Sequence, residues 1–155
     1  MDNEILVKEF RKIVRILRQE QGRMALFMLK SADTDIAGYW NVIVSTSEHD
    51  SLTTKKALKH LVRILRNNLS REVLRRIIRL TVLKTDDPFT KGITRKFNVR
   101  NSEKYIQSSV VSGIYIGNAI IFESASVPSA VKIKDKKKNS QNKKIRSVLC
   151  SSVIF

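Results

Sequence analysis

Lysine and arginine at helical spacing are the most regular chemical feature of this chain of 155 residues. Residues three and four apart lie on one face of a helix, so a cation repeated at that spacing forms a basic stripe. A stripe of this kind can neutralise phosphates and bind a polyanion with salt-dependent affinity. The alternative is that the cations only keep exposed helix faces in water. Two rows have this spacing: Lys8, Arg11, Arg15 and Arg18, followed by Lys56, Lys59, Arg63 and Arg66.

Carboxylates gather where strands are expected to end, an arrangement that could hold Mg²⁺ for phosphoryl-transfer or nuclease chemistry. Asp33-Thr34-Asp35 lacks the Gly-Ser turn that precedes paired aspartates in nucleotidyltransferases, and no Glu-x-Lys follows Asp87 as in restriction-like nucleases. Loop solvation and helix capping explain these residues without a metal, and Asp87-Pro88 is itself a helix start. The carboxylates in question are Asp33, Asp35, Asp86, Asp87 and Glu123.

Other catalytic and cofactor signatures are missing from the sequence. Neither His49 nor His60 has a second His or Cys nearby at ligand spacing, which a metal site of that type requires. The serines include no G-x-S-x-G elbow, and the five glycines form no phosphate-binding loop. We therefore expect no catalytic residues, no metal and no cofactor, and a protein that is not an enzyme.

The net charge of +16 is unevenly distributed and suggests a domain boundary. Residues 1–126 hold 22 Lys and Arg against 13 Asp and Glu, whereas residues 127–155 hold 8 against 1. From Lys132 to Lys144 the chain has almost no apolar residue, so we expect an α+β domain over 1–126 and a disordered basic tail over 127–155. The final segment, Ser147 to Phe155, is either a loosely docked strand or an exposed sticky segment.

The location follows from cysteine use and hydropathy. The single cysteine, Cys150, excludes an intramolecular disulfide framework, and the acidic start MDNE is unlike a secretory signal. The longest nearly apolar run, Val110 to Phe122, is too short for a spanning helix. These features predict a cytoplasmic protein with no membrane partner.

One stretch organises the expected fold. Trp40 to Val44 is aromatic and β-branched, which predicts a central strand buried on both faces with Trp40 in the core. A polar turn follows, in which Asp50 or Ser51 would cap the next helix. The apolar face of that helix is expected to consist of Leu58, Leu61, Val62, Leu65 and Leu69.

The remaining helices and strands are predicted from the spacing of apolar residues and from the glycine, proline and polar residues that interrupt it. We expect a helix over 3–21 ended by Gly22, a strand over 24–29 antiparallel to 40–44, and a short helix over 71–76 capped by Ser70. A third strand over 77–83, parallel to the second, would precede a weak helix that starts at Asp87-Pro88 and contains Gly92. Residues 101–107 would form another short helix. The run 113–122 would be a hairpin turning at Gly117-Asn118, or one strand with a bulge at Gly117.

The order of these elements resembles a family of small bacterial α+β domains without an assigned activity. The resemblance covers roughly residues 1–125 and implies a fold, but no site. The resemblance rests mostly on the pattern of apolar, core-forming residues in four segments, namely Ala25–Leu29, Trp40–Ser45, Ser70–Leu74, and Arg79–Leu83 with Asp86-Asp87-Pro88.

The sequence therefore predicts an α+β protein with a single four- to five-stranded mixed sheet packed against two long amphipathic helices. Its expected function is non-enzymatic binding of nucleic acid or another polyanion through the basic helix faces. One alternative is a protein-interaction module of a multi-subunit bacterial system, in which the charge meets an acidic protein. The other is a metal-dependent phosphoryl-transfer or nuclease enzyme that uses the carboxylates. The oligomeric state stays open.

Overall fold

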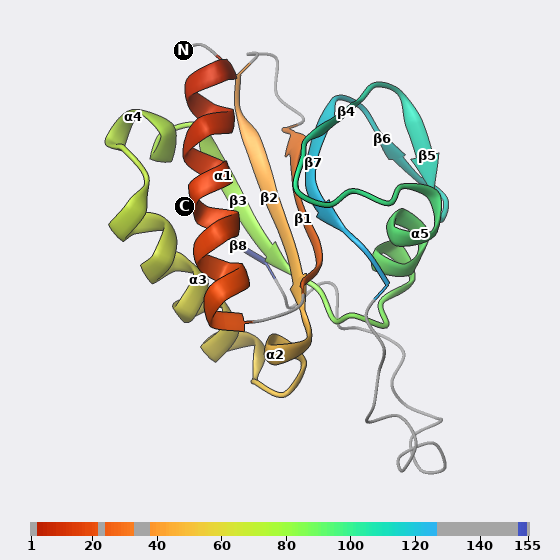
Figure 1. Ribbon diagram of the computed structural model, residues 1–155, viewed down its shortest axis with the longest axis horizontal. Helices are drawn as coiled ribbons and strands as arrows, with labels where there is room; N and C mark the ends of the chain where they lie inside the picture. Colours follow the sequence, from red (N-terminus) through yellow and green to blue (C-terminus); the bar gives the residue numbers. More distant parts are fainter. Residues whose placement is uncertain (1–2, 22–23, 33–37, 127–151, 155) are drawn as a thin grey trace.

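A mixed sheet organises the protein, whose computed structural model describes residues 3–21, 24–32, 38–126 and 152–154 (Figure 1). The strand order is β4-β7-β1-β2-β3-β8. Only β2 and β3 are parallel, and every other neighbouring pair is antiparallel. The strands are β1 Met24–Ser31, β2 Trp40–Thr46, β3 Ile77–Val82, β4 Lys104–Ile106, β7 Ala119–Ser124 and β8 Ser152–Ile154.

Two long helices cover one face of this sheet, as Figure 1 shows. They are α1, Asn3–Gln21, and α3, Thr54–Asn68, and the four-residue helix α4, Arg71–Leu74, follows α3. Phe10 of α1 packs against Phe27 of β1 and Phe122 of β7, with ring centroids 6.0 and 6.2 Å away, and these two rings also contact each other. The α+β class and the mixed sheet under two amphipathic helices are thus confirmed.

The opposite face carries α5, Pro88–Lys96, and a small second sheet of β5, Ser109–Val111, and β6, Ile114–Ile116. Asp87 caps α5 as predicted, since its Oδ1 accepts a hydrogen bond from the Phe89 amide at 2.9 Å. A Cβ on Gly92 would lie 2.7 Å from Cγ1 of Val111. The glycine expected to weaken this helix therefore lets the β5–β6 hairpin pack directly against it.

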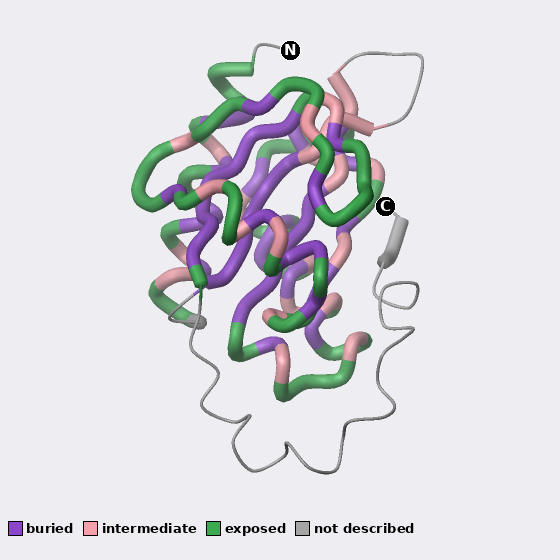
Figure 2. The backbone as a smooth tube through the Cα atoms, turned by 90° about the vertical axis from the view of Figure 1, so that its right-hand side faces the viewer, coloured by how far each residue is buried: buried purple, intermediate pink, exposed green. Residues whose placement is uncertain are grey.

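The predicted core is confirmed at Trp40 and for most of the apolar face of the second long helix, except at two positions. β2 lies between β1 and β3, Trp40 is 8% exposed, and the buried segments run through the middle of the molecule (Figure 2). The exceptions are Leu58 and Val62, which are only half-buried. Ala57 and Ile64 of α3 are buried in their place, so the apolar face is rotated from the expected one.

The predicted cap of α3 is wrong. Its N-cap is Thr53, whose hydroxyl accepts a hydrogen bond from the Lys56 amide at 3.3 Å. A separate short helix, α2, Ser47–Asp50, occupies the expected turn and is capped by Thr46. The Asp50 carboxylate instead accepts a hydrogen bond from the Thr85 amide at 3.0 Å, which ties α2 to the end of β3.

Two further predictions for the second half of the chain are wrong. Residues 104–106 form the edge strand β4 rather than a helix, because pairing with β7 decides their conformation. The hairpin turn lies at Ser112-Gly113, where both φ angles are positive, as a type I′ turn requires. Gly117-Asn118 has no left-handed φ and connects β6 of the small sheet to β7 of the large one.

The end of the chain supplies an additional strand. β8 pairs antiparallel with β3, Thr81 opposite Ser152 and Arg79 opposite Ile154, as the docked-strand alternative predicts for residues 152–154. Residues 127–151, Gly22, Asp33 and Asp35 lie outside the described residues, so the boundary at 126 stays a prediction. Among the described helices, none is long and apolar enough to cross a membrane.

Candidate polyanion-binding surface

The basic row of α3 lies on the side of the helix that faces solvent. Burial of Ala57, Leu61, Ile64 and Leu65 fixes the inner face of the helix against the sheet. The four cations of the row repeat at the same period on the opposite side, and all four are exposed. No acidic residue occurs between Ser51 and Ser70. Within the described part of the chain, no side chain of the row has an ion pair or hydrogen bond. The row comprises Lys56, Lys59, Arg63 and Arg66.

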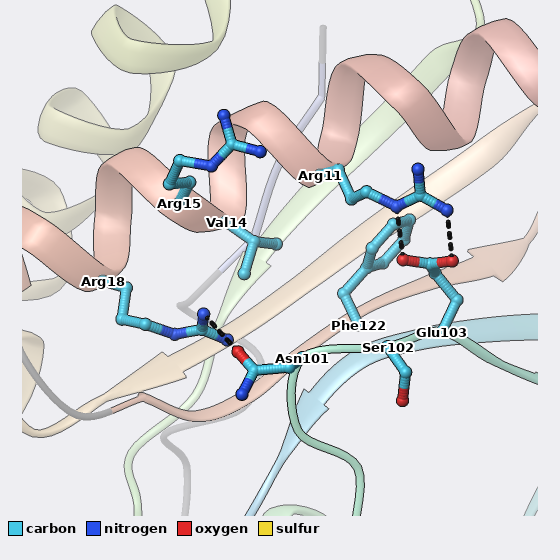
Figure 3. Close-up of a pocket in the computed structure, with 8 residues that line it drawn as sticks. All are labelled: Arg11, Val14, Arg15, Arg18, Asn101, Ser102, Glu103 and Phe122. Atoms are coloured by element: carbon cyan, nitrogen blue, oxygen red, sulfur yellow. Dashed lines mark hydrogen bonds and ion pairs between the residues drawn. The ribbon is translucent and has the colours of Figure 1, made fainter.

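The basic row of α1 is partly engaged by carboxylates of the same chain. Arg11 forms two parallel hydrogen bonds to Glu103, from Nε at 2.6 Å and Nη2 at 2.7 Å, drawn in Figure 3. Arg18 donates to Asn101 Oδ1 at 2.9 Å and pairs with the carboxylate of Glu123. The bond from Arg11 lowers the pKa of Glu103 and keeps that carboxylate charged. Half of this row is therefore already neutralised.

These contacts surround a small cavity of about 200 Å³ between α1 and the loop before β4 (Figure 3). Arg15 borders it, but Figure 3 shows its guanidinium directed away from the loop that carries Glu103. A bulge in β7 opposite Phe27 changes the register, so that Phe122 and Glu123 both contact α1. Lys8 and Arg15 are the exposed cations of this row that have no hydrogen bond or ion pair to a side chain among the described residues.

The two rows do not form one continuous surface. On the side of α1 that faces α3, Glu9 accepts a hydrogen bond from the Ser70 amide at 2.7 Å. On the same side, Glu20 lies 3.2 Å from Nε2 of His60 on α3. Carboxylates therefore lie along the contact between the helices, whereas Arg11 and Arg18 lie on the other side of α1. The eight predicted site residues form two separate groups, and with respect to the described residues only the α3 group has all its cations unpaired.

The two histidines, for which the sequence indicated no shared site, contact each other in the structure. Nε2 of His49 in α2 lies 3.3 Å from Nδ1 of His60 in α3, and His60 in turn contacts Glu20. His49 is 4% exposed, and burial, followed by the neighbouring His60, lowers its pKa to about 4. This chain of contacts links three helices, and it places only two histidines and one carboxylate in line.

The carboxylates proposed for a metal are used in other ways. Asp87 is buried at its cap, and burial raises its pKa. Asp86 is exposed, and Glu123 is held by Arg18. Among the residues that the structure describes, no group of three or more His, Cys, Asp or Glu could hold a metal ion. Asp50, which the sequence suggested only as a helix cap, also has a pKa raised by burial, and its carboxylate accepts a hydrogen bond from the Thr85 amide.

Comparison of the chain with protein families, with characterised proteins and with solved structures finds no match.

Proposed function

We propose that the protein binds nucleic acid without catalysis, through phosphate contacts made by the exposed row of α3. The observation that carries the proposal is that Lys56, Lys59, Arg63 and Arg66 are exposed and unpaired within the described chain, on a helix without acidic residues. A cation that already has a carboxylate partner must lose it before it can bind phosphate. The α3 row has no such cost, in contrast to Arg11 and Arg18 of α1.

The dimensions of the row suit a phosphate backbone. Ten residues separate Lys56 from Arg66, which corresponds to about 15 Å along a helix. One strand of duplex DNA carries a charge every 3.4 Å or so along its axis, so this length matches about four phosphates. No aromatic residue lies in α3 to stack on bases. These features support backbone binding that depends little on sequence.

The test compares two variants of the full chain that lose the same charge. The first changes Lys56, Lys59, Arg63 and Arg66 to Gln, which keeps helix propensity. Binding to a short DNA duplex and an RNA of equal length is measured by fluorescence anisotropy over a range of salt. We expect the slope of log affinity against log salt to decrease by about three to four, close to one for each phosphate that the variant no longer neutralises.

The matched control changes two lysines and two arginines of α5 and the loop that follows it, namely Lys91, Arg95, Lys96 and Arg100, all exposed. Both variants change the net charge from +16 by four, to +12, and both keep the basic residues 132–146. The contribution of that segment is therefore the same in the two proteins. Equal loss of binding in both variants, or no binding by the wild type at low salt, would refute the proposal.

A second candidate is a protein-interaction module, and exposed apolar residues favour it. The hairpin β5–β6 exposes Val110 and Tyr115 as a cross-strand pair, 57% and 62% exposed. Exposed apolar residues that gather on one part of a surface are typical of protein contacts. A pull-down from a bacterial lysate, with and without nuclease, separates the two candidates. Partners retained after nuclease treatment, and lost on changing Val110 and Tyr115 to Ser, would favour this one.

A further inference from the structure

A row of polar side chains crosses the centre of the sheet on the face that carries α5. Lys30 of β1, Asn41 of β2 and Arg79 of β3 are direct neighbours in the strand register. Side chains alternate between the faces of a strand, so this row shares its face with the buried Met28 and Ile43. This face of the sheet is therefore apolar beneath α5, and it is polar and cationic beside the N-terminal end of that helix.

A cavity of about 430 Å³ lies over this row. Small-molecule sites commonly have volumes of about 300–1,000 Å³ and combine apolar walls with a few polar groups. Here the floor is the polar row with Ile43, and the wall is Phe89 of α5 with Ile114 of the β5–β6 hairpin. The cavity thus combines an ionic end and an apolar end.

The wall is held in place by contacts of its own. Ser112 Oγ donates a hydrogen bond to the carbonyl oxygen of Pro88 at 3.0 Å, which fixes the hairpin turn to the start of α5. Gly92, one turn further along α5, packs closely against Val111 and Ser112 of the same hairpin. Asp87 fixes the first turn of the helix through the Phe89 amide. The site is therefore formed before any ligand enters it.

The charges that line the cavity favour an anion. Lys30 and Arg79 have no ion-pair partner among the described residues. Asp87 is the carboxylate of the lining, and it is buried and accepts a hydrogen bond from the Phe89 amide. Since adjacent strands lie about 4.8 Å apart, the Cα atoms of Lys30 and Arg79 are separated by about 10 Å. Both side chains are long enough to reach one anionic group placed over Asn41 between them.

We propose that this cavity binds a small organic anion, with a carboxylate, phosphate or sulfonate group on Lys30, Asn41 and Arg79 and an apolar body against Ile43, Phe89 and Ile114. Guanidinium and ammonium groups form charge-assisted hydrogen bonds with such oxygens, and the apolar walls exclude water from the rest of the ligand. The site lies on the face opposite α3 and is independent of the proposed binding of nucleic acid.

The probe that matches this chemistry is the dye anilinonaphthalene sulfonate, an aromatic anion whose fluorescence rises in apolar surroundings. Titration of the folded, full-length protein is expected to give one saturable site per chain. Changing Lys30 and Arg79 to Gln should weaken dye binding about tenfold or more, as charged hydrogen bonds are removed. The neutral analogue phenylnaphthylamine, which lacks the sulfonate, should lose little affinity in the same variant.

Two further variants locate the site. Ile114→Ala should weaken both dyes, because it removes the apolar wall, and its exposed position makes a loss of folding unexpected. Lys55→Gln with Arg71→Gln removes the same charge from exposed positions on α3 and α4, outside the cavity and the basic row, and should leave both affinities unchanged. The melting temperature of each variant reports folding. No saturable site in the native protein, or equal effects of the two charge-removing variants, would overturn the proposal.

Discussion

The contact between the two histidines predicts that the protein loses stability as the pH falls below neutral. If the carboxylate of Glu20 accepts from Nε2–H of His60, then Nδ1 of His60 must accept from Nε2–H of His49. This leaves Nδ1 of His49 as a lone pair, and that atom is buried without a partner in the described structure. A proton added there would place an unpaired charge in the protein interior.

The sign and size of the effect follow from the pKa of His49, which is about 4 in the folded protein against an ordinary value of 6.5. Because the folded value is the lower one, the unfolded chain binds more protons between these pH values. The contribution is fully present above pH 6.5, decreases as the pH falls through this window, and changes little below about 4. Between about pH 7.5 and pH 5 the loss is at most about 2 kcal/mol, or a decrease in melting temperature of about 4–8 °C.

The measurement is thermal and urea unfolding of the wild type and His49→Gln at several pH values. Glutamine can still donate to His60 but does not titrate, so the variant should show a flatter profile between pH 7.5 and pH 5. Asp50 and Asp87 have raised pKa values and act in the opposite direction, and they are common to both proteins. Parallel profiles of the two proteins would show that His49 does not contribute in this way.

Four substitutions test the packing and capping described above. Phe10→Ala should destabilise the protein by about 3–5 kcal/mol in urea unfolding, because it removes one of three mutually packed phenylalanine rings; a loss below about 1 kcal/mol would contradict this packing. Gly92→Ala should destabilise the protein by about 1–2 kcal/mol, because overpacking against Val111 outweighs the gain of up to about 1 kcal/mol in helix propensity. A stabilised variant would show that the β5–β6 hairpin can move away from α5 at little cost. Thr53→Ala should cost about 1 kcal/mol and Ser51→Ala much less, and the reverse order of melting temperatures would restore Ser51 as the cap of α3.

Part of the candidate site could be predicted from the sequence. The spacing of Lys56, Lys59, Arg63 and Arg66 places them on one helix face, and the absence of acidic residues in that helix is visible in the chain. The polar row of the sheet could not be found in this way. Lys30 and Arg79 occur at unremarkable positions, and only strand register brings them together with Asn41.

The sequence by itself determined the helices and strands whose structure depends on residues close to them in the chain. The apolar period of residues 3–21, the β-branched run at Trp40 and the Asp87-Pro88 start act over a few residues, so no tertiary contact was needed to predict them. Strand β4 and the turn at Ser112-Gly113 were predicted wrongly because pairing overrides propensity in short polar segments.

Only the tertiary structure decided which charges are already paired. Arg11 meets Glu103 across 92 residues of sequence, and Arg18 meets Glu123 across 105. The contact of His49 with His60 likewise depends on how α2 and α3 pack. Helical period decides on which face a side chain lies, because each residue turns by a constant angle. Helical period does not show which residues lie opposite that face, because the packing of segments distant in sequence decides which side chains meet there.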